Sequence, residues 1–132
     1  MLNHRIGRIF AGAALAAALL GPAACAPTYD EARAGPALRT ISVSASADRL
    51  LPCMDRLLVA AWTARGVTVA RAQTRAGRFG ELVINDRGGP LLLVEALTRS
   101  PYESRVDMRA LRLRVDTEDL DRIATVAEAC SS

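Results

Sequence analysis

Alternating apolar and polar positions predict five β-strands in this chain. The first strand covers residues 39–46, in which Ile41 and Val43 share one side and polar side chains take the other. Four more strands are predicted between residues 67 and 115, separated by short turn sequences rich in Gly, Pro, Asp and Ser. Their ranges are 67–74, 81–85, 90–98 and 104–115. Connections this short cannot hold a parallel crossover, so neighbouring strands among these four are predicted to be antiparallel.

A helical period replaces the alternation after Ser46. Apolar side chains recur every three or four positions over residues 50–62, which predicts a helix with Ser46 as its candidate N-cap and Gly66 as its end. Pro52 has no N–H and fits best in the first turn of a helix. We therefore expect the regular part of this helix to begin near Arg49.

A second helix is predicted at the C-terminal end of the chain. Asp116 is its candidate N-cap, and Glu118 and Asp119 place negative charge in its first turn. Its apolar stripe consists of Leu120, Ile123, Ala124 and Ala127. Together these patterns predict an α+β domain with a mainly antiparallel sheet of about five strands and two helices packed on one face. The predicted order is strand, helix, four strands, helix.

The last predicted strand changes the parity of its apolar side chains. Val106, Met108 and Ala110 point one way by alternation, whereas Leu111 and Leu113 point the other way. One continuous strand cannot bury both sets on one face. We therefore expect a bulge or bend near Ala110, or two halves of the strand that meet different partners.

Each predicted helix carries a cysteine on its apolar side. Cys53 lies at helical spacing from Leu50 and Leu57, and Cys130 follows Ala127 by three positions. We predict a disulfide between Cys53 and Cys130, which would close a loop of about 78 residues and stabilise the fold by about 4–5 kcal/mol in the loop-entropy model. The alternative, two unpaired buried thiols, does not suit an oxidising compartment.

Residues 1–24 have the layout of a bacterial export signal, with a basic start, an apolar run and then small residues. The apolar run before Gly21 is about a dozen residues long, whereas spanning a bilayer takes about twenty. A retained transmembrane helix is therefore the weaker interpretation.

The end of this segment resembles the lipobox of bacterial lipoproteins, in which Leu, a small residue, and Gly or Ala precede a cysteine that becomes lipidated. Ala23 and Ala24 fit the two positions before Cys25, and Pro22 stands where Leu is usual. The resemblance implies a lipid anchor of palmitate-type acyl chains on Cys25. Because Ala26 is not Asp, it also implies an outer-membrane lipoprotein that faces the periplasm.

Ordinary signal cleavage is the alternative to the anchor. Gly21 and Ala23 are small residues at the third and first positions before a cut, which would release a soluble periplasmic protein that carries Cys25. Cysteine parity favours the anchor. If Cys53 and Cys130 pair, lipidation of Cys25 leaves no odd thiol among the 3 cysteines.

Residues 26–38 contain Pro, Gly and mixed charges without a sustained period, which predicts a flexible tether. Extended at about 3 Å per residue, such a tether could hold the domain tens of ångströms from its anchor. The chain is thus divided into an export signal at 1–24, the anchor cysteine with its tether at 25–38, and a single α+β domain at 39–132.

The net charge of +3 does not indicate a nucleic-acid binder. Arg5 and Arg8 belong to the signal, which leaves fifteen basic residues against 14 acids, close to balance. The 1 histidine, His4, also lies in the signal. Its position excludes from the mature chain the catalytic mechanisms and zinc sites that need His. With no phosphate-loop motif either, we expect no catalytic residue, no metal and no cofactor.

Hydrolysis by paired carboxylates is the remaining enzyme alternative. Residues 116–121 (DTEDLD) are rich in acids, but helix capping and the helix dipole explain this cluster more simply. Asp107 lies between Arg105 and Arg109 on one strand face and is predicted to join a surface charge ladder.

Residues 90–98 are apolar at both parities, which points to a second buried or bound face of the sheet. Two helices cover only one face. The other face is expected either to offer an apolar patch to a ligand or partner, or to be covered by the tether or by long Arg side chains. The candidate patch consists of Val83, Leu91, Leu93 and Leu97, with Arg105, Arg109, Arg112 and Arg114 as an anion-binding rim. Its candidate occupants are another envelope protein, a lipid-like ligand or a second copy of the chain.

This order of elements behind a lipoprotein-like signal is similar to that of small envelope lipoproteins such as the lipopolysaccharide-assembly lipoprotein of the outer membrane. The similarity covers architecture and targeting, and it rests on no residue motif in the domain. It implies a non-catalytic binding or assembly role in the cell envelope, with a membrane attachment through Cys25. A soluble periplasmic module that binds a small ligand or lipid is the alternative.

Overall fold

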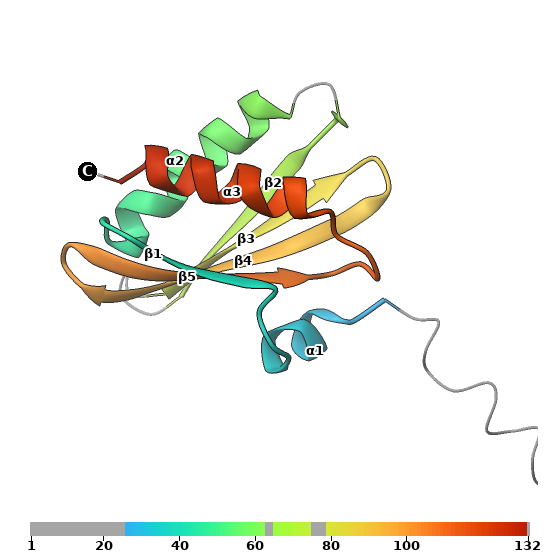
Figure 1. Cartoon of the computed structure of the whole chain (residues 1–132), viewed down its shortest axis with the longest axis horizontal. Coiled ribbons are helices and arrows are strands. Elements are labelled where there is room, and N and C mark those ends of the chain that lie inside the picture. Colours follow the sequence, from blue (N-terminus) through green and yellow to red (C-terminus); the bar gives the residue numbers. More distant parts are fainter. Residues whose placement is uncertain (1–25, 63–64, 75–78, 132) are drawn as a thin grey trace, which may run out of the picture.

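The computed structural model describes residues 26–62, 65–74 and 79–131. There, five strands form one antiparallel sheet in the order β1-β5-β4-β3-β2. The strands are β1 (Arg39–Val43), β2 (Thr68–Thr74), β3 (Phe79–Asp86), β4 (Gly89–Ser100) and β5 (Glu103–Ala110). The helices α2 (Ala47–Ala61) and α3 (Thr117–Ala129) lie on one face of the sheet, as predicted, and a short helix α1 (Tyr29–Ala34) lies on the other (Figure 1).

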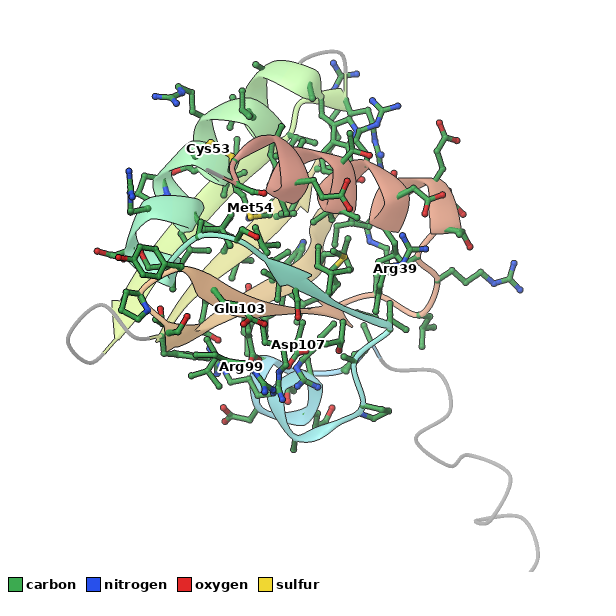
Figure 2. The ribbon with its side chains drawn as sticks, turned by 60° about the vertical axis from the view of Figure 1, so that its left-hand side comes forward. Arg39, Cys53, Met54, Arg99, Glu103 and Asp107 are labelled. Atoms are coloured by element: carbon green, nitrogen blue, oxygen red, sulfur yellow. A yellow bond between two sulfur atoms is a disulfide. The ribbon has the colours of Figure 1, made fainter. Side chains whose placement is uncertain are left out.

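The main core lies between the sheet and the two helices α2 and α3. Alternate side chains of β3, β4 and β5 reach it, because successive residues of a strand point to opposite faces. The side chain of Met54, a residue of α2, lies on the side of the helix that faces the sheet (Figure 2). The largest fully buried side chains of this core are Leu50, Leu51, Met54, Leu58, Leu82, Ile84, Leu92, Met108 and Ile123.

The predicted disulfide joins Cys53 of α2 to Cys130, the C-cap of α3, with Cα atoms 5.8 Å apart (Figure 2). It connects the two helices over the same face of the sheet. The linked residues are 77 positions apart in the sequence. The loop that the disulfide closes therefore contains every strand of the sheet except β1.

The start of α2 differs from the prediction, which placed it near Arg49. The helix begins at Ala47, despite Pro52 within it. Two contacts secure this earlier start: Ala47 N–H donates to Thr98 Oγ1 at 2.9 Å, and Leu50 N–H donates to the Ser46 carbonyl at 2.9 Å. Pro52 costs one intrahelical hydrogen bond without displacing the helix.

The predicted strand 104–115 ends at Ala110, and a bend follows. The expected change of direction near Ala110 is therefore confirmed, while the strand itself does not reach Val115. The bend separates the apolar side chains of this stretch. Leu111 is buried on the face that carries α1, Leu113 is exposed, and Val115 packs against the main core.

The prediction of a flexible tether is wrong for Tyr29–Ala34, which forms α1. Thr28 is its N-cap, and a reciprocal pair of hydrogen bonds joins Thr28 and Glu31 in a capping box. Ala32 is buried against Leu93 and Leu111 of the sheet domain. Cys25 and the predicted signal at 1–24 lie outside the described residues.

Candidate functional site

Three acidic side chains lie next to one another on the face of the sheet that carries α1, hereafter the second face. Asp107 of β5 pairs across the strands with Glu95 of β4, and Glu95 pairs with Glu81 of β3. We call these three residues the carboxylate row. Like charges on directly opposed residues destabilise a sheet unless other groups compensate them.

Three arginines compensate the carboxylate row. Arg109 lies 3.3 Å from Glu95 (Nε–Oε1) and 3.4 Å from Asp107 (Nη2–Oδ2). Asp107 also accepts hydrogen bonds from Arg105 at 3.0 Å and from Thr40 Oγ1 at 2.7 Å. Figure 2 shows Asp107 on the side of the sheet where α1 lies.

The third arginine comes from α1. Arg33 donates two parallel hydrogen bonds to Glu81, from Nε at 2.8 Å and from Nη2 at 3.0 Å. The Glu81 side chain is 8% exposed, so its charge is almost withdrawn from water. The guanidinium of Arg33 is the only cation that forms a salt bridge with this carboxylate among the described residues. The segment predicted to be a tether therefore neutralises a buried charge of the domain.

Glu95 is the least compensated member of the row. Its burial raises the pKa of its carboxyl, the charges of Glu81 and Asp107 raise it further, and Arg109 opposes them. Its Oε1 atom is buried and receives no hydrogen bond of good geometry within the described ranges. Ionised Glu95 therefore costs the folded state free energy at neutral pH.

The part of the second face next to the β4–β5 hairpin is open. Leu97 is 39% exposed, and Tyr102 at the hairpin turn is 81% exposed. Arg105, the cross-strand neighbour of Leu97, keeps 39% of its side chain exposed. A cavity of about 290 Å³ is lined by residues 98–101 of the same hairpin. Since α1 packs near Ala110, at the other end of β5, these side chains remain accessible.

The predicted apolar patch is not one continuous exposed surface. Leu93 is fully buried under α1, and Val83 packs beside it. Leu91 is buried in the core on the opposite face, so only Leu97 of the four is exposed. Around Leu93 and Val83 the second face is covered by α1, which lies within the predicted tether, whereas it stays open at Leu97.

The predicted rim is also divided. Arg105 and Arg109 contact the carboxylate row. Arg112 binds Asp86 with two hydrogen bonds of 2.7 and 3.1 Å at the β3–β4 turn, and Arg114 is exposed to solvent. Asp107 does pair with arginines, as predicted, but it is buried rather than on the surface, between the side chains of Arg105, Arg109 and Thr40 that bind it.

A second charged cluster, away from the carboxylate row, joins the turn at Asp86 to the helices. Arg65 bonds Asp119 of α3 at 2.6 Å and lies 3.4 Å from Asp86. The hydrogen bonds from Arg112 lower the pKa of Asp86 to about 2, assisted by the Gly88 N–H and opposed by burial. Asp119 is thus the one buried acid of the predicted cluster 116–121, and it is ion-paired. Nowhere in the described ranges do three or more metal-binding side chains cluster in a way that could hold a metal ion.

Arg33, Glu81 and Glu95 are not among the residues that the sequence pattern predicts to be functional. One local signal was available, because Thr28 and Glu31 have the spacing of a capping box. Nothing local marks the pairing of Glu81 with Glu95, which depends on the register between two strands.

The fold and the second face define a disulfide-linked α+β domain whose sheet is covered by two helices on one face and in part by α1 on the other. Comparison with protein-family models, with curated proteins and with solved structures found no match to this chain. In the part of the chain that the structure describes, no helix has the length and apolar content needed to cross a membrane.

Proposed function

We propose that the chain is an exported lipoprotein, anchored through Cys25 to the outer membrane and facing the periplasm, with a non-catalytic binding or assembly role. The observation that carries this proposal is the disulfide between Cys53 and Cys130. Disulfides persist in oxidising compartments. Of the 3 cysteines in the chain, this bond leaves Cys25 as the odd one, and lipidation accounts for it.

A binding role is supported by the environment of the buried acids. Glu81, Asp107 and Asp119 lie in ion pairs with arginine at 2.6 to 3.0 Å. Each of these three carboxylates is bound by an arginine instead of facing a cavity that could hold a substrate. Glu95 has a raised pKa, as a general acid would, yet its carboxyl is covered by the ion-paired groups around it. These features favour structural roles for the acids.

The open end of the second face is the surface on which we place the contact. Leu97 and Tyr102 offer apolar contact area, and the exposed Arg99 adds positive charge beside them. This combination suits another envelope protein with an acidic and partly apolar surface, since such patches with a polar rim mark protein–protein contacts.

The anchor is tested by a mass spectrum of the protein from the membrane fraction. We expect an N-terminal peptide that begins at Cys25 and carries the added mass of a diacylglyceryl group, with or without a further acyl chain. A peptide that begins at Ala24, with Cys25 unmodified, would refute the anchor and leave the soluble periplasmic alternative. Cys25→Ser is the matched variant and should move the protein into the soluble fraction.

The contact surface is tested with a matched pair of apolar-to-arginine changes. The mature chain, coupled to beads through Cys25, is exposed to a detergent extract of envelope proteins. Leu97→Arg should abolish capture of any partner, whereas Leu113→Arg, at a position 64% exposed beyond the end of β5, should not. Equal capture by both variants would rule out the open end of the second face.

A further inference from the structure

The helix α1 is the first described element after Cys25, and few contacts hold it to the domain. Ala32 is its one buried residue. Arg33 makes the bidentate pair with Glu81, and the guanidinium of Arg109 donates a hydrogen bond to the Gly35 carbonyl. A cavity of about 220 Å³ remains between α1 and β5, lined among others by Pro27, Ala32 and Leu38. The packing of α1 on the sheet is therefore incomplete.

These contacts are weak compared with those of the main core. An isolated helix of 6 residues is far below the length that is stable in water, so α1 forms because it is docked. Arg33 remains 42% exposed in its pair with Glu81, and besides this pair only Ala32 and the hydrogen bond from Arg109 hold α1 to the sheet within the described residues. The helix ends at Gly35, in extended conformation, and Pro36 follows. Since β1 begins only at Arg39, α1 can detach without disturbing the sheet.

We propose that α1 is a strap that sets how far the domain stands from its anchor, an inference that rests on the anchor at Cys25 proposed above. With α1 docked, only the three steps from Cys25 to Thr28 separate the anchor from the domain, a reach of about 10 Å. With α1 released, the chain runs freely from Cys25 to Leu38, whose N–H donates to the Met108 carbonyl, a reach of up to about 45 Å. Release also uncovers Leu93 and Glu81, which extends the open end of the second face.

Hydrogen exchange on the mature chain without lipid tests the docking. The N–H groups of Ala32 and Gly35 donate to the Thr28 and Glu31 carbonyls at 2.9 Å, so their exchange reports on α1. Arg33→Gln should speed exchange at both amides at least tenfold and leave the amides of β4 unchanged. Arg56→Gln removes the same charge from an exposed position on α2 and should change neither.

The reach is tested on vesicles that carry a maleimide lipid and a dansyl-labelled lipid. Cys25 couples the mature chain to the maleimide, and energy transfer from Trp62, the 1 tryptophan of the chain, to the dansyl groups measures closeness to the bilayer. Transfer should be lower for Arg33→Gln than for the wild type and for Arg56→Gln.

The outcomes separate the strap from the anchor. Chemical coupling replaces the cell's own lipidation, so an unmodified Cys25 in the mass spectrum refutes the anchor without affecting these two measurements. The strap is overturned if the amides of Ala32 and Gly35 exchange as slowly as those of β4 and Arg33→Gln leaves them so. Equal energy transfer for Arg33→Gln and the wild type overturns the change in reach.

Discussion

Replacement of Asp86 by asparagine is expected to weaken the fold in a pH-dependent way. Asp86 accepts two hydrogen bonds from Arg112 and one from the Gly88 N–H, and its side chain is 13% exposed. These partners lower its pKa from 3.8 to about 2. At about 1.4 kcal/mol per pKa unit, the ionised carboxylate stabilises the folded state by about 2.5 kcal/mol at neutral pH.

The sign follows from proton linkage. A carboxyl whose pKa is lower in the folded state contributes fully above its unfolded pKa, and the contribution is lost as the pH falls through the folded pKa. Asp86→Asn should therefore lower the free energy of unfolding by about 2.5 kcal/mol at pH 7, and the difference from the wild type should shrink between about pH 4 and pH 2.

Urea denaturation followed by circular dichroism measures this difference at several pH values. Glu103→Gln, which neutralises an exposed acid outside the salt bridges of the described residues, is the control and should stay within about 0.5 kcal/mol of the wild type. A loss for Asp86→Asn that is the same at pH 7 and pH 2 would show that packing at the turn, and not the charge of Asp86, is responsible. A loss no larger than that of the control would refute the reasoning altogether.

Three further predictions concern the core, the disulfide and the carboxylate row. The double change Cys53→Ser and Cys130→Ser should lower the free energy of unfolding by about 4–5 kcal/mol, measured by denaturant titration. A reductant should lower the free energy of unfolding of the wild type and leave that of the double variant unchanged. Leu93→Ala should cost about 2–5 kcal/mol and Leu97→Ala less than about 1 kcal/mol, because only Leu93 is fully buried. Glu95→Gln should leave the free energy of unfolding unchanged or raise it at pH 7. As the pH falls, the free energy of unfolding of the wild type should rise relative to that of the variant, because a raised carboxyl pKa makes the folded state bind the proton more tightly.

Much of the helix-covered side of the molecule could be predicted from the sequence. Periods of two and of three to four positions locate the buried side chains directly, and Cys53 and Cys130 follow apolar residues of the two helices at helical spacing. The α1 segment could not be found in this way. It buries only Ala32, and a single apolar contact leaves no periodic pattern. The capping box at Thr28 predicts where a helix begins but not that it docks on a distant strand.

The second face depends on two irregularities of β4 that the sequence pattern does not reveal. Counting back from the turn, with Asp86 opposite Gly89, a regular hairpin would place Glu81 opposite Val94. In the structure the register shifts between Ile84 and Asn85, so Leu91 is bypassed and Glu81 pairs with Glu95.

The bypassed residue explains the one apolar position that the sequence assigned to the wrong face. Leu91 shares its parity with Leu93, yet the bulge turns it into the core beside Leu92. A second shift, between Thr98 and Ser100, changes the pairing of β4 with β5.

Together the two shifts create the carboxylate row. In a regular hairpin Asp107 would oppose Ala96, but after the second shift it opposes Glu95. The same two bulges therefore bring three acids into one line and make the second face need a cation from outside the sheet. Arg33 supplies it, so the docking site of α1 is set by the register of strands that lie far from it in the sequence. Removing one bulge residue from β4 would break the row and, with it, the docking site of α1, although the sequence of α1 would be unchanged.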